Sequence, residues 1–206
     1  DGNVYEIILI GEQWWMKENL KTIHYNNGEE IQLKMTGSEG SSDEGQYGIY
    51  NNDPSNADIY GNLYNWVVID DERGICPEGF HVPSDEEWSI FITYLDEDAY
   101  MWDEGSGSNY WHLQSHIAGG LMKSIGTIQS ANGLWFEPNF GAINESGFTA
   151  LPSGTGVFWG TWVSFGLGIE GTFWSSSEHS HGLSAWVRSE EHTSELQSRR
   201  NLVCRL

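Results

Sequence analysis

The side chains best suited to chemistry in this 206-residue chain are the oxygen donors of Glu137 and Asn139, which flank Pro138. Carboxylate and amide oxygens are hard ligands of the kind that Ca²⁺ prefers, and a proline can hold the loop that aims them. Proline and asparagine also favour turns for purely local reasons. The triplet therefore predicts either a calcium site at Glu137 and Asn139 or a structural turn, and the turn is the simpler interpretation.

Aromatic side chains are the second group that could contact a ligand. The chain has 11 Trp, 9 Tyr and 8 Phe, too many for a disordered polypeptide. Exposed rings can stack on sugars, because they offer large flat apolar faces at little entropic cost. Trp135, Trp159 and Trp162 are therefore candidate ligand-binding residues. The alternative is that these rings pack the core of a domain with short strands.

No other constellation points to catalysis or to a cofactor. His112 and His116 have the i, i+4 spacing of a metal pair, but the sequence offers no third ligand. The segment 174–178 reads WSSSE and lacks the G-x-S-x-G nucleophile elbow. The acidic stretches 51–54 and 70–72 lack the spacing of a known calcium loop. We therefore expect no enzyme and no cofactor, with a structural calcium ion as the one alternative.

The charge limits the classes of partner. The formal net charge is −21, which argues against binding to nucleic acid or to an anionic membrane surface. No apolar run approaches the roughly 18 residues needed to span a bilayer, so we expect no membrane insertion by this segment. A polysaccharide or surface glycan remains the expected partner class.

One strong local signal predicts the main helix that must support any site. Ser84 and Glu87 have the spacing of a capping box. The residues after it place one apolar face along a helix, because they recur at i, i+3, i+4 and i+7: Trp88, Phe91, Ile92 and Leu95. The segment from Ser84 is therefore expected to be a helix docked on the core.

Weaker patterns predict the remaining elements. Residues 4–10 are rich in β-branched side chains and indicate a strand. Residues 60–66 favour a short helix, and 118–124 a turn and short strand. The short aromatic segments 148–151, 157–163 and 172–174 are separated by glycines. This pattern predicts an antiparallel meander with long loops.

Several blocks, in order, resemble the Fibrobacter succinogenes major paralogous domain family: DGNVYEIILIGEQWWMKENLKT, YGNLYNW, GICPEGFHVPSDEEW, AGGLMKS, NESGFTALPSG and FWSSSE. The resemblance implies a secreted or surface-attached bacterial domain, often found in lipoproteins, with no established activity. It therefore implies an extracellular or cell-surface location, although this chain shows neither a signal peptide nor a lipobox.

A further likeness concerns the fold. The block HVPSDEEW is similar to a motif of formylglycine-generating enzymes, which implies an α+β domain of C-type-lectin-like architecture with an irregular antiparallel sheet, one or two main helices and long loops. Glu137-Pro138-Asn139 is similar to the triplet by which mannose-type C-type lectins bind calcium and sugar. Their second motif, Trp-Asn-Asp, does not occur here, and nothing matches the paired catalytic cysteines of the enzymes.

The last residues look foreign to the rest of the chain. RSEEHTSELQS at 188–198 and NLVCRL at 201–206 are translations of the two ends of a common sequencing adapter, in one frame and with the right gap. We therefore predict a truncated native domain at 1–187 and a non-native tail at 188–206. The closing strand of the family would then be missing, and Cys76 would lack a partner; if the tail is encoded, Cys204 becomes that partner.

Three functions follow from these observations. The first is a non-enzymatic surface or secreted domain for adhesion or glycan contact, which an exposed aromatic patch would favour. The second is a structural display module that binds nothing small, which complete burial of the aromatic rings would favour. The third is an enzyme related to the formylglycine-generating type, which needs a pocket with convergent polar groups.

Overall fold

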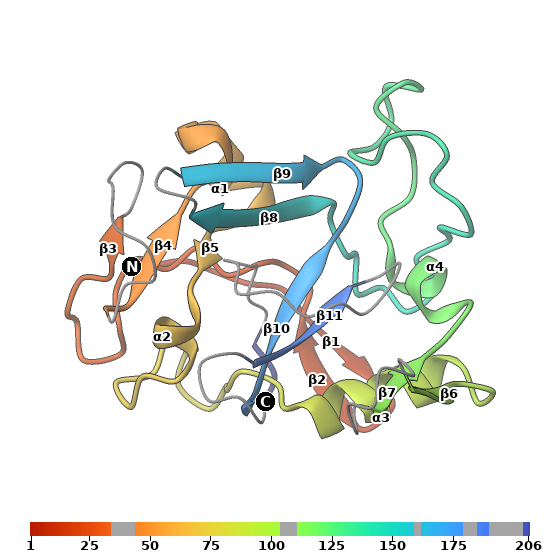
Figure 1. The fold of residues 1–206 in the computed structure, drawn as a ribbon, viewed down its shortest axis with the longest axis horizontal. Helices are drawn as coiled ribbons and strands as arrows, with labels where there is room; N and C mark the ends of the chain where they lie inside the picture. The colour runs from red at the N-terminus through yellow and green to blue at the C-terminus, as the bar shows by residue number, and fades with distance from the viewer. Residues whose placement is uncertain (34–43, 104–110, 159–161, 179–184, 190–203) are drawn as a thin grey trace.

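The computed structural model describes residues 1–33, 44–103, 111–158, 162–178, 185–189 and 204–206. Within them the chain is an α+β domain, as predicted, built from small two- and three-stranded sheets and a few helices (Figure 1). Within these ranges, no helix has the length and apolar character needed to cross a bilayer.

The N-terminal part forms two of these sheets. β1 (Ile7–Ile10) and β2 (Gln13–Met16) make a hairpin. β3 (Gln32–Leu33) lies parallel to β4 (Gln46–Gly48), which pairs antiparallel with β5 (Leu63–Tyr64). The short helices η1 (Tyr50–Asn52), α1 (Pro54–Tyr60) and α2 (Trp66–Ile69) connect and follow these strands.

The predicted helix is present as α3 (Asp85–Leu95). Ser84 is its N-cap, and the reciprocal capping box with Glu87 is formed: the Ser84 hydroxyl accepts from the Glu87 N–H, and the Glu87 carboxylate accepts from the Ser84 N–H. Trp88 and Phe91 are each 1% exposed. The apolar face therefore docks on the core as the spacing predicts.

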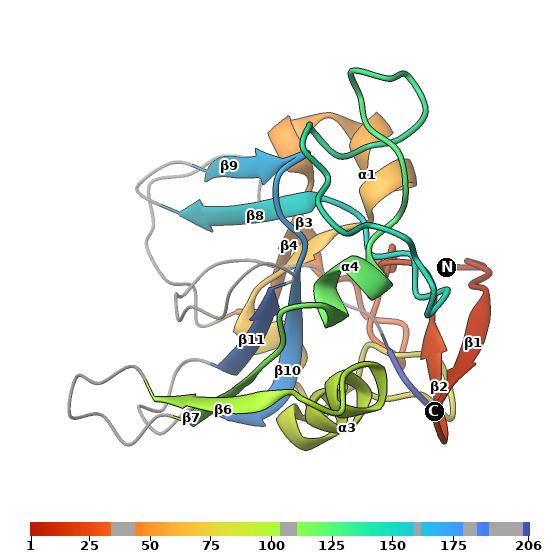
Figure 2. The same cartoon turned by 90° about the vertical axis from the view of Figure 1, so that its right-hand side faces the viewer.

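The C-terminal half contributes three antiparallel pairs and one short helix. β6 (Tyr100–Asp103) pairs with β7 (Trp111–Gln114), and α4 (Ala118–Met122) follows. β8 (Ser153–Phe158) pairs with β9 (Trp162–Leu167), and β10 (Thr172–Glu178) pairs with β11 (Ala185–Ser189). Figure 2 shows β10 running between the β8–β9 pair and α3. The antiparallel pairing was predicted, but the strands form separate pairs instead of one meander.

Two aromatic-rich clusters form the core. One joins the β1–β2 hairpin, α3 and β10, with the Trp15 ring 4.6 Å from Trp88 and 4.8 Å from Phe91. The other lies under β4, β5 and α2 and contains Tyr64 and Trp174. More than half of the aromatic side chains whose burial the structure describes therefore pack the interior.

Two predicted elements are wrong. Residues 60–66 are not one helix: Tyr60 ends α1, Gly61 adopts a φ of +76°, and the chain then forms β5. Gly61 is required there, because a Cβ would lie 2.6 Å from the Cβ of Asn19. Residues 118–122 are a helix, although a turn and strand were predicted.

The C-terminus also differs from the prediction that no closing strand would be present. Cys204 forms a disulfide with Cys76, and Arg205 forms antiparallel bridges with both Trp15 and His81. The three last residues thus take the place of a closing strand beside β2. The prediction that residues 188–206 derive from a sequencing adapter concerns the encoding DNA. The fold does not test it, and it stays a prediction.

Candidate functional site

The segment between α4 and β8 carries the predicted calcium triplet, and we call residues 123–152 the long loop. It is fixed to the domain at both of its ends and in its middle. Lys123 and Ala150 form a parallel bridge near the two ends. In the middle, the Phe136 N–H donates to the Gly168 carbonyl at 2.6 Å, in the β9–β10 connection. Figure 1 shows this loop in green to teal, rising beside that connection at the right of the molecule.

Glu137 holds one turn of the long loop together. Its carboxylate Oε1 accepts hydrogen bonds from the hydroxyls of Thr127 at 3.1 Å and Ser130 at 3.2 Å. Its backbone N–H donates to Oε1 of Gln129 at 3.0 Å. The Glu137-Pro138 peptide bond is cis. The exposed Glu137 side chain therefore fixes the turn at 127–130.

Asn139 holds the segment 124–126 that precedes this turn. Its amide Nδ2 donates to the carbonyls of Ser124 and Gly126, at 3.1 Å each. Its Oδ1 is buried and has no hydrogen-bond partner among the described residues. Both residues predicted as calcium ligands are thus used in contacts with residues 124–130. Within the described part of the chain, no group of three or more His, Cys, Asp or Glu side chains could hold a metal ion. Calcium at Glu137 and Asn139 stays a prediction.

Trp135 corrects the prediction of ligand-binding tryptophans. Its ring is only 2% exposed, its indole N–H donates to the Ser124 hydroxyl at 2.9 Å, and the Lys123 ammonium lies 5.0 Å from the ring centroid. A ring buried in this way supports the long loop from inside and offers no face to a sugar. Trp159 lies outside the described residues, and Trp162 is described only as the first residue of β9.

The exposed aromatic rings of the long loop are two phenylalanines that the sequence reasoning missed. Phe136 is 43% exposed and Phe140 is 76% exposed, and they directly flank the Glu137–Asn139 triplet. Exposed aliphatic side chains accompany them on the same loop. We use the name loop patch for the exposed large apolar residues of the long loop, which are Ile125, Ile128, Phe136, Phe140 and Ile143. The sequence signal that could have identified Phe136 and Phe140 was their position on either side of the polar triplet Glu137–Asn139.

A glycine allows Phe136 to lie against the neighbouring connection. Gly168 has a φ of +81°, and a Cβ there would lie 2.5 Å from Cδ2 of Phe136. Both the backbone conformation and the close approach therefore require glycine at this position. The β9–β10 connection thus sets where the Phe136 ring sits in the loop patch.

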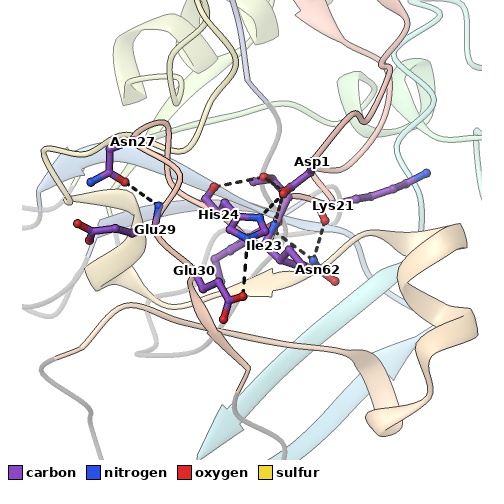
Figure 3. Close-up of polar contacts among 10 residues, drawn as sticks. Asp1, Lys21, Ile23, His24, Asn27, Glu29, Glu30 and Asn62 are labelled. Atoms are coloured by element: carbon purple, nitrogen blue, oxygen red, sulfur yellow. Dashed lines mark hydrogen bonds and ion pairs between the residues drawn. The ribbon is translucent and has the colours of Figure 1, made fainter.

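A second polar cluster lies at the start of the chain (Figure 3). The Asp1 carboxylate accepts from the Ile23 N–H at 2.7 Å and from the Thr22 hydroxyl, and it pairs with Nδ1 of His24. Nε2 of His24 lies 4.0 Å from the Glu30 carboxylate. These contacts fasten Asp1 to residues 22–24, so we assign the cluster a structural role.

The fold and loop together define a class: a small α+β domain whose loop patch is carried on an ordered non-repetitive segment. The chain belongs to the Fibrobacter succinogenes major domain family, whose profile matches residues 8–202. This confirms the family expected from the sequence blocks. Neither a curated protein nor a solved structure matches the chain significantly.

Proposed function

We propose that this domain is a non-enzymatic binding domain, secreted or attached to the bacterial cell surface, which contacts glycans through the loop patch. The observation that carries the proposal is the exposure of Phe136 and Phe140 on either side of Glu137 and Asn139. Flat apolar rings next to hydrogen-bonding groups suit a sugar, because sugars present apolar C–H faces and polar hydroxyl edges.

The proposal includes a C-type-lectin-like architecture. It is supported by the α+β composition, by one main helix packed on short antiparallel strands, and by a long ordered loop that carries the exposed residues. A role for calcium is part of the same proposal, because Glu137 is exposed and the Oδ1 of Asn139 has no hydrogen-bond partner among the described residues.

The test is retention of the full chain on polysaccharides and on a glycan array, with and without a calcium chelator. Phe140→Ala is expected to abolish or strongly weaken retention, since it removes the most exposed ring of the loop patch. Tyr94→Ala is the matched control, because Tyr94 is an exposed ring, 62% accessible, on α3. Loss of binding on chelation would add calcium to the proposal.

The competing function is a display module that binds nothing small, favoured by the burial of Trp15, Trp88, Trp135 and Trp174. Absence of retention on every polysaccharide tested would support the display module. Equal retention of Phe140→Ala and the unaltered chain would mean that the loop patch is not the glycan site.

A further inference from the structure

The last three residues of the chain occupy a slot between β2 and His81, and Figure 2 shows the C-terminus beside β2. From β2, the Met16 N–H and the Trp14 carbonyl bind the segment Cys204–Leu206, at 3.1 Å in both hydrogen bonds. On the other edge, the His81 N–H donates to the Arg205 carbonyl at 2.8 Å, and the Arg205 N–H donates to the His81 carbonyl at 2.9 Å. The extended segment therefore has a backbone partner on each side, with Arg205 bridged to both Trp15 and His81.

Side chains make the slot selective for two neighbouring residue types. Cys204 is fully buried in the core cluster and is joined to Cys76 by the disulfide. The Arg205 guanidinium pairs with the Glu87 carboxylate. In a chain with only 9 Lys and Arg against 30 Asp and Glu, an arginine that meets Glu87 is a specific match. The slot thus selects an extended strand in which a cysteine precedes a basic residue.

Every partner of this strand lies far away in the sequence. Cys76 is 128 positions from Cys204, and Glu87 is 118 positions from Arg205. The acceptor residues lie between 14 and 87, so they belong to the native domain whichever residues close it. Without the strand, β2 and His81 would present unpaired backbone groups, and an open edge of this kind is a template for another chain.

We propose that this slot is a strand-acceptor site that also takes the Cys204–Leu206 strand of a second copy of this chain, and that the two copies are then joined by a Cys76–Cys204 disulfide. The contacts are four backbone hydrogen bonds, one disulfide and one ion pair, all made by three consecutive residues. A second copy supplies the identical strand, and exchange of an identical element is a low-cost route to a dimer. The inference is independent of the glycan proposal.

The covalent step is a thiol–disulfide exchange with a small disulfide such as oxidised glutathione. The Cys204 thiolate of one copy first displaces one glutathione thiolate and becomes a mixed disulfide. The Cys76 thiolate of the other copy then attacks the sulfur of Cys204, and the second glutathione leaves as a thiolate that takes a proton from water. Two protein thiols are oxidised, and one molecule of oxidised glutathione is reduced to two of glutathione.

The test mixes two full-length variants that cannot close their own disulfide. Cys204→Ser leaves Cys76 as the acceptor, and Cys76→Ser leaves Cys204 as the donor. After incubation with oxidised glutathione, non-reducing mass spectrometry with peptide mapping is expected to find a heterodimer linked Cys76 to Cys204. The absence of dimers, or 76–76 and 204–204 links in statistical proportion, would overturn the proposal.

A charge exchange at Arg205 and Glu87 tests whether the disulfide link forms through the slot. Arg205→Glu in the donor is expected to lower the heterodimer yield several-fold, because two carboxylates then face each other. Glu87→Lys in the acceptor is expected to restore the yield with this altered donor and to lower it with the original one. If neither Arg205→Glu nor Glu87→Lys changed the heterodimer yield, the Cys76–Cys204 link would form outside the slot, and the proposal would fail.

Discussion

Trp88 on α3 donates its indole N–H to the main-chain carbonyl of Trp174 on β10 across 3.1 Å. The Trp174 indole makes the same kind of bond to the carbonyl of Tyr64 on β5, at 2.9 Å. All three residues are 2% exposed or less. Because a buried N–H without an acceptor costs free energy, these two bonds allow large rings to fill the core. They also link α3 to β10 and β10 to β5.

Replacing Trp88 should therefore be costly. Trp88→Ala is expected to lower the free energy of unfolding by about 3–5 kcal/mol, since it opens a cavity next to Trp15 and Phe173. Guanidinium unfolding followed by circular dichroism measures it. Ile90→Ala is the control on the same helix, because Ile90 is 50% exposed. A loss below about 1 kcal/mol for Trp88→Ala would contradict the docking of α3.

Glu87 should make stability depend on acid pH. Burial tends to raise the pKa of its carboxyl, but the Ser84 N–H, Arg205, His81 and the Ser84 hydroxyl donate hydrogen bonds that together lower the pKa of Glu87 from 4.5 to about 2. Because the folded pKa is depressed, the stabilisation is fully present above pH 4.5 and is lost as the pH falls towards 2.

Glu87→Gln keeps a side chain that can complete the capping box but removes the charge. We expect it to lower the free energy of unfolding by about 1–2 kcal/mol at pH 7. The difference from the unaltered chain should shrink between pH 4.5 and 2. Urea unfolding over this pH range measures it, with Glu86→Gln on the exposed side as the control. A difference that stays constant down to pH 2 would mean that the stabilisation does not come from the negative charge of Glu87.

The disulfide should contribute strongly, because it joins residues 128 positions apart. Reduction is expected to cost about 2–5 kcal/mol, which for a domain of this size lowers Tm by roughly 5–20 °C. Calorimetry with and without dithiothreitol measures the change. The double variant Cys76→Ser, Cys204→Ser should melt at the reduced temperature and should not respond to dithiothreitol. If dithiothreitol lowered the Tm of the double variant, the loss of stability would have a cause other than reduction of the Cys76–Cys204 disulfide.

The elements that the sequence predicted well are those whose signals are local. α3 follows from its capping box and its apolar spacing, and both act within a few residues. α4 was missed because Gly119 and Gly120 disfavour a helix. The structure requires Gly120 for another reason: a Cβ there would lie 2.4 Å from the Gly141 carbonyl of the long loop. This packing is non-local, so the sequence pattern could not show it.

The candidate site was predicted only in part for the same reason. The sequence offered a structural turn or a calcium site for the Glu137–Asn139 triplet, and in the structure both side chains form hydrogen bonds with residues 124–130 of the same loop. It could not show which aromatic rings remain exposed, because burial depends on how the long loop folds back. Trp135 points inward to Ser124, whereas the hydrogen bond between Phe136 and Gly168 leaves the Phe136 ring at the surface.

Asn139 provides the sharpest test of what the triplet does. Its Nδ2 donates to the carbonyls of Ser124 and Gly126. Asn139→Asp replaces this donor by an oxygen that faces both carbonyls, so we expect a loss of about 1–3 kcal/mol in the free energy of unfolding. Asn27→Asp is the control, because the Asn27 side chain accepts from the Glu29 N–H and an aspartate can still accept.

The same substitution separates a structural turn from a calcium site. A carboxylate is at least as good a calcium ligand as an amide oxygen, so Asn139→Asp would keep or strengthen a site in which residue 139 binds the ion. If the triplet is only a structural turn, Asn139→Asp loses stability with the two Nδ2 hydrogen bonds, and millimolar calcium does not restore it. Thermal unfolding with added calcium or with a chelator distinguishes the two. If calcium raised the Tm of Asn139→Asp to that of the unaltered chain, the ion and not the turn would explain the triplet.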